Sequence, residues 1–537
     1  MLNDKSDNNF YFIIRICLYG IGILLGFLLF FTSNAKAQET EEIFRKRISL
    51  PSQKTSIYNA LNQLSDSTGY LFAYSSNDVL SDRTIRPNIK NIPLREALFQ
   101  ILGDTLFKFR IIEKHILIYK ETTQKTISAD ENIEESKSRL AIKGRILDSK
   151  TRQPIIYATV GLPLFGIGTI TNQDGTFYLK IPSELLNNHI IISHIGYESK
   201  EMSVAILSQQ TVDIFLETNY ISIQEVFIRN IEPQFLVKEA VLRIPTNFNA
   251  NPAYLTAFYR EGVVKDNKYQ NYSEAIFSIY KTSYSNNYET DQVKLLKSRK
   301  IHKIEQTDTI SIKLRGGVNS ALLLDISKNL PDFFDIETIN YFNFSRKDIV
   351  TIGNRTAYEI AFEQKPHIAE ALLKGVVYID MENLAILGAD FEINPKFISS
   401  VADMFLLKRN RKFIIKPERV YYSVRYSKVN ESYNLSHVRG DLHFKYRKRK
   451  SIFYSPFHTF IELVVTQIET QNVKRFDRHE IEKTTTVFTD NNYEFDEQFW
   501  GDFNIITPEQ SIFDALNQIN SKIEQISIKK ENNNPNQ

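Results

Sequence analysis

The chain of 537 residues contains a single cysteine, Cys17, which lies in an apolar run near the N-terminus. The rest of the chain can form no disulfide bond and offers no thiolate to a metal ion. Stability must therefore come from packing.

The chain also lacks an excess of charge of one sign and has almost no tryptophan. Its formal net charge is +3, from 66 basic and 63 acidic residues, which argues against a dedicated nucleic-acid binder. One tryptophan stands against 37 phenylalanines and 27 tyrosines. Because aromatic residues favour strands, we predict a mainly β protein, long enough for about three domains.

Long hydrophobic runs are missing except for one, from Ile16 to Phe31. Lys5 and Arg15 precede this run and Ala35-Lys36-Ala37 follows it, a pattern typical of a signal peptide over residues 1–37. The protein is expected to be exported. We expect it not to be lipidated, because the charged Arg15 stands two positions before Cys17, where a lipoprotein box would be uncharged. The alternative is an uncleaved membrane anchor.

Catalytic motifs are missing too, since the chain has neither a Gly-x-Ser-x-Gly elbow nor a Walker-type loop. His-x-x-Glu begins at His302, His367 and His479, but none has a clear third ligand, so surface histidines are preferred to a zinc site. Asn172-Gln173-Asp174-Gly175 lacks the later glutamate of a calcium loop and is interpreted as a turn. We predict no catalytic, cofactor-binding or metal-binding residue.

Residues 44–120 contain a short internal repeat. Apolar residues at helical spacing form one stripe from Ile57 to Leu64 and another from Leu94 to Ile101. A strand-like run follows each helix, at 70–74 and 107–112, and a last strand is expected at 116–119. Thr55 or Ser56 can cap the first helix, and Pro93 stands where the second begins.

This doubled order, with Leu50-Pro51 before the first helix and Gly69-Tyr70 after it, resembles the secretin and TonB short N-terminal domain. The resemblance implies an α+β module that docks signalling proteins at the periplasmic end of outer-membrane transporters. Residues 121–138 are polar and acidic, and are predicted to be a linker.

Residues 139–218 alternate apolar and polar side chains in four runs, at 140–146, 156–160, 177–181 and 212–216. Turn residues separate the runs, and we assign structural roles to Gly144, Asp174, Gly175 and Gly196. The set resembles the carboxypeptidase regulatory-like domain. The resemblance implies a β-sandwich that binds or positions other molecules and does not catalyse.

Residues 219–525 read as strands separated by polar turns, which predicts one large, curved antiparallel sheet. We also expect an exit strand at 225–228, helices at 235–244 and 512–523, and a disordered tail at 526–537. Phe258–Glu261 and Phe499–Asn504 resemble the uncharacterised C-terminal region of exported Bacteroidetes-type proteins. Gly375–Glu392 resembles a hairpin of the lipoprotein-carrier-like sheet.

Basic residues cluster at 408–412 and 445–450. They mark either solvated hairpin ends or a contact with an acidic partner or anionic lipid.

The functional prediction is a non-enzymatic exported adaptor or binding protein of the cell envelope, docking partners as in TonB-linked transport or signalling. We expect it in the periplasm, or on the periplasmic face of the outer membrane, of a Gram-negative bacterium. Its partner would be a transporter or an anti-sigma-type protein, with a possible outer-membrane or lipid contact and no nucleic acid. The alternatives are a carrier of a lipid or apolar ligand in the C-terminal sheet and an unrecognised hydrolase.

Overall fold

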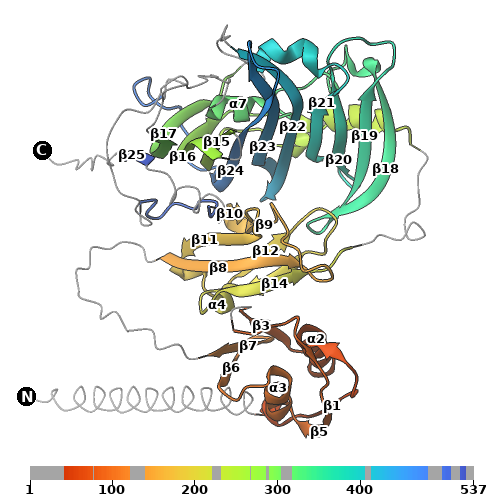
Figure 1. Ribbon diagram of the computed structural model, residues 1–537, viewed down its shortest axis with the longest axis vertical. Helices are drawn as coiled ribbons and strands as arrows, with labels where there is room; N and C mark the ends of the chain where they lie inside the picture. Colours follow the sequence, from red (N-terminus) through yellow and green to blue (C-terminus); the bar gives the residue numbers. More distant parts are fainter. Residues whose placement is uncertain are drawn as a thin grey trace, which may run out of the picture. The chain divides into compact units, whose positions relative to one another are not determined.

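The computed structural model describes residues 42–75, 78–120, 139–219, 231–265, 268–285, 289–303, 317–405, 413–481, 499–508 and 521–527. The protein is mainly β, as predicted, with a large curled antiparallel sheet and few helices (Figure 1). It divides into two compact units, the first ending at Asn132 and the second beginning at Ile133. The predicted signal segment and the linker at 121–138 lie outside the described residues. Within the described ranges, every helix is too short or too polar to cross a membrane.

The first unit is the predicted α+β module with two amphipathic helices. Its elements are β1 (Arg47–Leu50), β2 (Thr55–Ser56), α2 (Ile57–Thr68), β3 (Leu71–Tyr74), β4 (Thr84–Ile85), β5 (Ile89–Pro93), α3 (Leu94–Leu102), β6 (Phe107–Ile112) and β7 (His115–Lys120). Strands β3, β7 and β6 form a sheet in which β3 runs parallel to β7, while β1 pairs with β5 and β2 with β4.

Both predicted helix stripes are buried, and the predicted cap is confirmed as Ser56. The Ser56 hydroxyl accepts a hydrogen bond from the Asn59 amide at 3.2 Å, which satisfies one of the open donors of the first turn. Gly69 and Gly103 end the two helices in left-handed backbone, the usual helix stop.

The second unit begins with a two-sheet sandwich. Its elements are β8 (Arg139–Asp148), β9 (Thr159–Leu162), η1 (Pro163–Phe165), β10 (Ile167–Ile170), β11 (Thr176–Pro182), η2 (Ser183–Leu185), β12 (His189–Ser193), β13 (Lys200–Ser203), α4 (Val204–Leu207) and β14 (Val212–Leu216). One sheet has the order β11-β8-β14 and the other β13-β12-β9-β10. The alternation predicted for β8 and β11 is confirmed, with Ile142, Ile146 and Leu179 buried.

Three details of the sandwich differ from the prediction. Ile156 is 38% exposed because it lies in a turn before β9, where Tyr157 has a positive φ. Strand β14 is buried at every position, since both of its faces are covered, and Asp213 is tolerated there by an ion pair with Arg145 at 3.0 Å. Gly144 lies inside β8 and not in a turn.

The remaining elements build the large sheet. They are α5 (Pro233–Leu242), α6 (Ile244–Asn247), β15 (Ala253–Lys265), β16 (Lys268–Lys281), β17 (Gln292–Lys303), α7 (Val318–Leu323), η4 (Ile339–Tyr341), β18 (Phe342–Ile352), β19 (Arg355–Gln364), β20 (Leu373–Asp380), β21 (Ile386–Ile393), η5 (Ile398–Phe405), β22 (Phe413–Val429), β23 (Ser432–Lys448), β24 (Ser455–Glu469) and β25 (Ser521–Ser527). Strands β18 to β24 follow in sequence order, and β24 then pairs with β15, which continues through β16 and β17 to β25.

The sandwich and the large sheet share hydrogen bonds. Strand β10 pairs with β24 at Ile167 and Gln467, beyond the point where β23 leaves β24. This junction makes one 15-stranded sheet that includes β13-β12-β9-β10. The two parts of the second unit are therefore bonded through their backbones.

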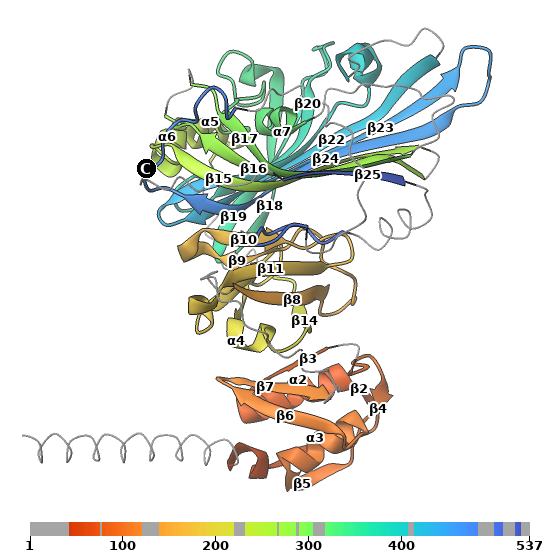
Figure 2. The same ribbon diagram turned by 90° about the vertical axis from the view of Figure 1, so that its left-hand side faces the viewer.

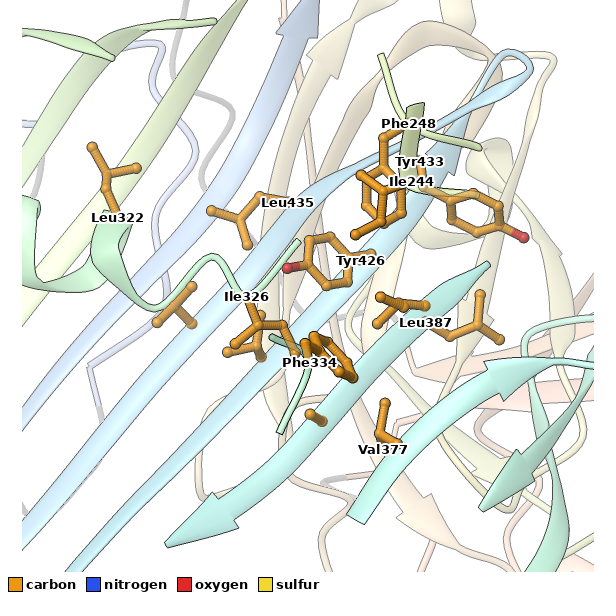
Figure 3. Close-up of a cluster of buried hydrophobic side chains, with 14 of the residues drawn as sticks. Ile244, Phe248, Leu322, Ile326, Phe334, Val377, Leu387, Tyr426, Tyr433 and Leu435 are labelled. Atoms are coloured by element: carbon orange, nitrogen blue, oxygen red, sulfur yellow. The ribbon is translucent and has the colours of Figure 1, made fainter. Parts of the chain in front are cut away.

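The main hydrophobic core covers one face of the large sheet. Helices α5, α6 and α7 and the segment 326–341 pack there, while the sandwich meets the other face (Figure 2). In Figure 3, Tyr426 from β22 lies among Ile326, Phe334 and Leu435. Its hydroxyl donates to Asp325 at 2.7 Å, so the one polar atom of this side chain is satisfied inside the core.

Several helix predictions in this region need correction. The helix predicted at 235–244 is present as α5, which begins at Pro233 and ends at Leu242, while Ile244 already belongs to α6, with Pro245 in its first turn. Residues 365–372, which contain His367 and Glu370, form a loop. The end of the helix predicted at 512–523, and the start of the tail predicted at 526, are strand β25, since pairing with the edge of β17 overrides the helical periodicity. Residues 225–228 and 509–520 lie outside the described ranges.

Candidate functional site

A pocket of about 700 Å³ lies on the polar face of β18 to β22. Because side chains alternate along a strand, this face carries the residues between those that enter the core. Cross-strand pairing aligns Ser345, Ala361, Val376, Asp390 and Ser423 as one row across the five strands. Five basic and three acidic residues line the pocket: Lys347, Lys365, Lys374, Lys396, Arg419, Glu363, Asp390 and Glu392.

Two buried amides fix the rim of the pocket. The Gln364 amide nitrogen donates to the carbonyls of Ile368 and Glu370 at 2.8 and 2.9 Å. Its oxygen accepts from the Asn394 side chain at 3.2 Å, and the Asn394 backbone donates to Leu372 at 2.9 Å. The loop after β19 and the turn after β21 are thereby tied together, and they carry Lys365 and Lys396.

Asp390, at the base of the pocket, is fully engaged. Its carboxylate accepts hydrogen bonds from Arg425 at 2.7 Å and from the hydroxyls of Tyr378 and Tyr421, each at 3.1 Å. Burial alone would raise the pKa of Asp390, but the charge and hydrogen bonds of Arg425 outweigh it and hold the pKa below its usual value. Asp390 stays ionised at neutral pH and cannot act as a general acid there.

The other charges are only partly paired, and the Glu363 carboxylate, like two lysines of the rim, has no hydrogen-bond or ion-pair partner among the described residues. Glu392 is bound by Arg419 at 2.9 Å and lies 3.6 Å from Lys374. The ammonium groups of Lys365 and Lys396 have no hydrogen-bond or ion-pair partner among the described residues. The carboxylate at the base of this polar pocket is neutralised by Arg425, and lysines at the rim have no partner among the described residues. Such a pocket is suited to a ligand that carries negative charge.

A second polar cluster continues along the same face at β15, β23 and β24. Glu462 is completely buried and accepts from Arg260 at 2.5 Å, while His437 lies 3.0 Å and Arg439 3.4 Å away. Burial opposes the charge on Glu462, but Arg260 and Arg439 outweigh it and hold its pKa far below the usual range. Tyr157 of the sandwich covers His437, with ring centres 5.1 Å apart. The cluster is closed over by the sandwich and is structural.

The segment 499–508 ties the sandwich to the sheet. Trp500 packs edge-on against Phe258 of β15, with ring centres 5.8 Å apart. The Asn504 side chain accepts from the Lys180 amide at 2.6 Å and donates to the Lys180 carbonyl at 3.1 Å, and Asn172 donates to the Thr507 carbonyl at 3.1 Å. Two motifs that are separate in sequence, Phe258–Glu261 and Phe499–Asn504, thus meet at one joint.

The predicted turn residues lie in the sandwich, away from the pocket. Gly175 has φ +72°, and the Asn172 side chain accepts from the amides of Asp174 and Thr176 at 3.0 and 2.9 Å, so the predicted turn is confirmed. Gly196 is a turn residue with φ +79° whose amide donates to Thr351 of β18 at 2.8 Å. Gly144 instead makes room for the Phe177 ring, 2.5 Å from where a Cβ would stand.

The histidine motifs are not brought together into a site. His367 lies in the loop 365–372 with Glu370, while Glu305 and Glu482 are outside the described ranges. In the part of the chain that the structure describes, no group of three or more His, Cys, Asp or Glu residues is placed to hold a metal ion. The pocket itself was missed, because its residues are spread over five strands and no local motif marks them.

Comparisons with known proteins assign one domain of the chain to a family. No curated protein matches the chain. Among solved structures, a DUF1329 family protein from Desulfovibrio piger ATCC 29098 aligns with 10% identity over 47% of this chain and 100% of its own, at a TM-score of 0.24, which is too low to support an argument. The family model of the CarboxypepD_reg-like domain matches residues 142–228. The chain therefore contains a carboxypeptidase regulatory-like domain, in the sandwich where the sequence predicted it.

Proposed function

We propose that the protein is a non-enzymatic, exported binding protein of the cell envelope whose second unit takes a negatively charged ligand in the pocket of β18 to β22. The observation that carries this proposal is the charge arrangement of the pocket. Asp390 and Glu392 are held as ion pairs, while Lys365 and Lys396 stand without a partner among the described residues of the rim.

The same arrangement argues against a hydrolase. Acid–base catalysis needs a carboxyl group with a raised pKa or a histidine at the reacting centre, and the Asp390 pKa is shifted the other way. None of the described residues that line the pocket is a histidine. The alternative of an apolar carrier loses support as well, because α5, α6 and α7 already pack on the apolar face of the large sheet.

Within this proposal the first unit docks an envelope protein, as its resemblance to the short N-terminal domain of secretins and TonB-linked transporters implies. Strand β3 has a single strand partner, β7, among the described residues, so its other edge can pair with an added strand. Deleting residues 44–120 should abolish co-purification of that partner from native envelopes. Unchanged recovery of the same partner would contradict this part of the proposal.

The pocket is tested by ligand-induced thermal stabilisation, with citrate and hexaglutamate as anionic probes and hexalysine as the cationic counterpart. We expect the anionic probes to raise Tm, since a ligand that binds only the folded state stabilises it. The double substitution Lys365→Gln and Lys396→Gln should remove most of that rise.

Lys474→Gln, which removes an exposed lysine outside the pocket, should leave the response intact. If the probes raise Tm equally for the unsubstituted protein, the double variant and Lys474→Gln, they act through general charge. If neither anionic probe raises the Tm of the unsubstituted protein, the result counts against an anionic ligand of this kind.

A further inference from the structure

The turn between β23 and β24 presents two large apolar side chains to solvent. Ile452 is 81% exposed and Phe453 79% exposed, and they are consecutive in the chain. Strands β22 and β23 run out together to this end, as Figure 2 shows toward its upper right. We call residues 449–454 the hairpin tip.

The tip has a defined shape. Arg447 donates to the carbonyls of Arg449 and Ser451, at 3.2 and 2.7 Å, from inside the turn. The Phe453 amide donates to the Ser451 hydroxyl at 3.2 Å. The guanidinium of Arg447 also lies over the Tyr454 ring, 5.2 Å from its centre. Because Arg447 fills the inside of the turn, the side chains of Ile452 and Phe453 point into solvent.

The tip also stands on a packed base. Phe444, Tyr446 and Phe457 form a small buried cluster between β23 and β24, separate from the main core. Because the base is packed, the exposed apolar pair is held at a fixed position. The pair therefore loses little conformational entropy when it binds to another surface.

Cations surround the apolar pair. Residues 445–455 contain five basic residues and no acidic one. Lys416 and Lys265 lie beside them, over the rings of Tyr454 and Tyr446 at 5.4 and 5.1 Å. The nearby carboxylate of Glu418 is paired with Lys445. The side chains of Arg449 and Lys450 have no partner among the described residues.

We propose that the hairpin tip docks on an anionic lipid surface, with Ile452 and Phe453 inserted among the acyl chains and the basic residues on the headgroups. The pattern of apolar side chains at an apex ringed by cations is that of an interfacial membrane contact. A protruding pair needs a preformed hollow on a protein partner, whereas a lipid surface deforms around it. This inference is independent of the ligand pocket.

The test is a tryptophan placed in the full-length chain at the tip, Phe453→Trp, mixed with phosphatidylglycerol or phosphatidylcholine vesicles. The native Trp500 is buried and serves as a constant background. The matched control is Ile336→Trp, because Ile336 is also 81% exposed but stands between Asp335 and Glu337. A local probe is needed because the apolar run of residues 16–31 could itself bind vesicles.

On phosphatidylglycerol, we expect the emission of the Phe453→Trp variant to shift to the blue and to be quenched by brominated acyl chains, with neither change for Ile336→Trp. Adding Arg449→Gln and Lys450→Gln should weaken vesicle partitioning of the tip about fivefold for each charge removed. High salt should weaken it too, since the Debye length falls to about 3 Å at 1 M.

Three outcomes would overturn the proposal. They are an unshifted emission of the tip variant on anionic vesicles, an equal response of the control variant, and a tip variant that responds only to an acidic protein from envelope extracts and not to protein-free vesicles.

Discussion

Gly175 lies at a backbone position of the sandwich that favours glycine. Its φ of +72° is costly for any residue with a side chain, and a Cβ there would stand 2.6 Å from the Ile146 carbonyl oxygen. The sequence revealed this position because Asp-Gly between two alternating runs has a short-range physical cause.

We predict that Gly175→Val destabilises the second unit by at least about 1–2 kcal/mol, the cost of left-handed backbone for a side chain. Gly353→Val is the matched control, because Gly353 has φ +64° and no atom within 4 Å of its added Cβ. Thermal melting should show the larger loss for Gly175→Val. Equal losses would mean that the contact with Ile146 adds nothing.

Glu462 shows the opposite case, a residue whose importance no local pattern indicates. Its partners Arg260 and His437 come from other strands, so only the strand order brings them together. The same holds for Asp390 and Arg425 in the pocket, and for this reason the sequence predicted the sheet but not the site.

Glu462→Gln should lower the free energy of unfolding by about 3–5 kcal/mol, because it removes the negative charge that faces the buried guanidinium groups of Arg260 and Arg439. Glu392→Gln should cost only about 0.2–1 kcal/mol, since its partner Arg419 has a side chain 57% exposed and water screens the pair. Urea denaturation measures both. Comparable values would show that the Glu462 cluster is not an interdependent network.

At the scale of elements, the strand-like runs between polar turns predicted the large antiparallel sheet correctly, because each strand of such a sheet has one apolar face. Prediction failed where tertiary pairing decides. The helical apolar spacing of residues 512–523 predicted a helix, yet its last residues belong to β25, which adds to the edge of β17. Ile156 looked like an inward strand residue but lies in the turn that presents Tyr157 to His437.

The segment 499–508 acts as a joint between elements, and Asn504 is its most specific contact. Asn504→Ala should cost about 1–3 kcal/mol, since the backbone amide and carbonyl of Lys180 both lose their partner. Hydrogen exchange at the Lys180 amide should accelerate. The neighbouring amide of Leu179, in the β8–β11 ladder, should not change. Unaltered exchange at Lys180 would contradict the assigned contact.

At the scale of the molecule, the two compact units should unfold independently. We expect the calorimetric trace of the full chain to equal the sum of the traces of residues 1–132 and 133–537. The sandwich and the large sheet, in contrast, should melt in one transition because they share the β10–β24 pairing. A separate sandwich transition would contradict that continuity.

The position of β8 has a mechanical consequence. The second unit's first described strand begins at Arg139 and lies between β11 and β14, paired with β11 over residues 139–145 and with β14 over residues 144–148. A force along β8 would load these bonds in shear, so that they must fail together and not one after another. A load applied at Arg139 along the strand is therefore shared by two ladders, and β8 resists extraction from the sandwich.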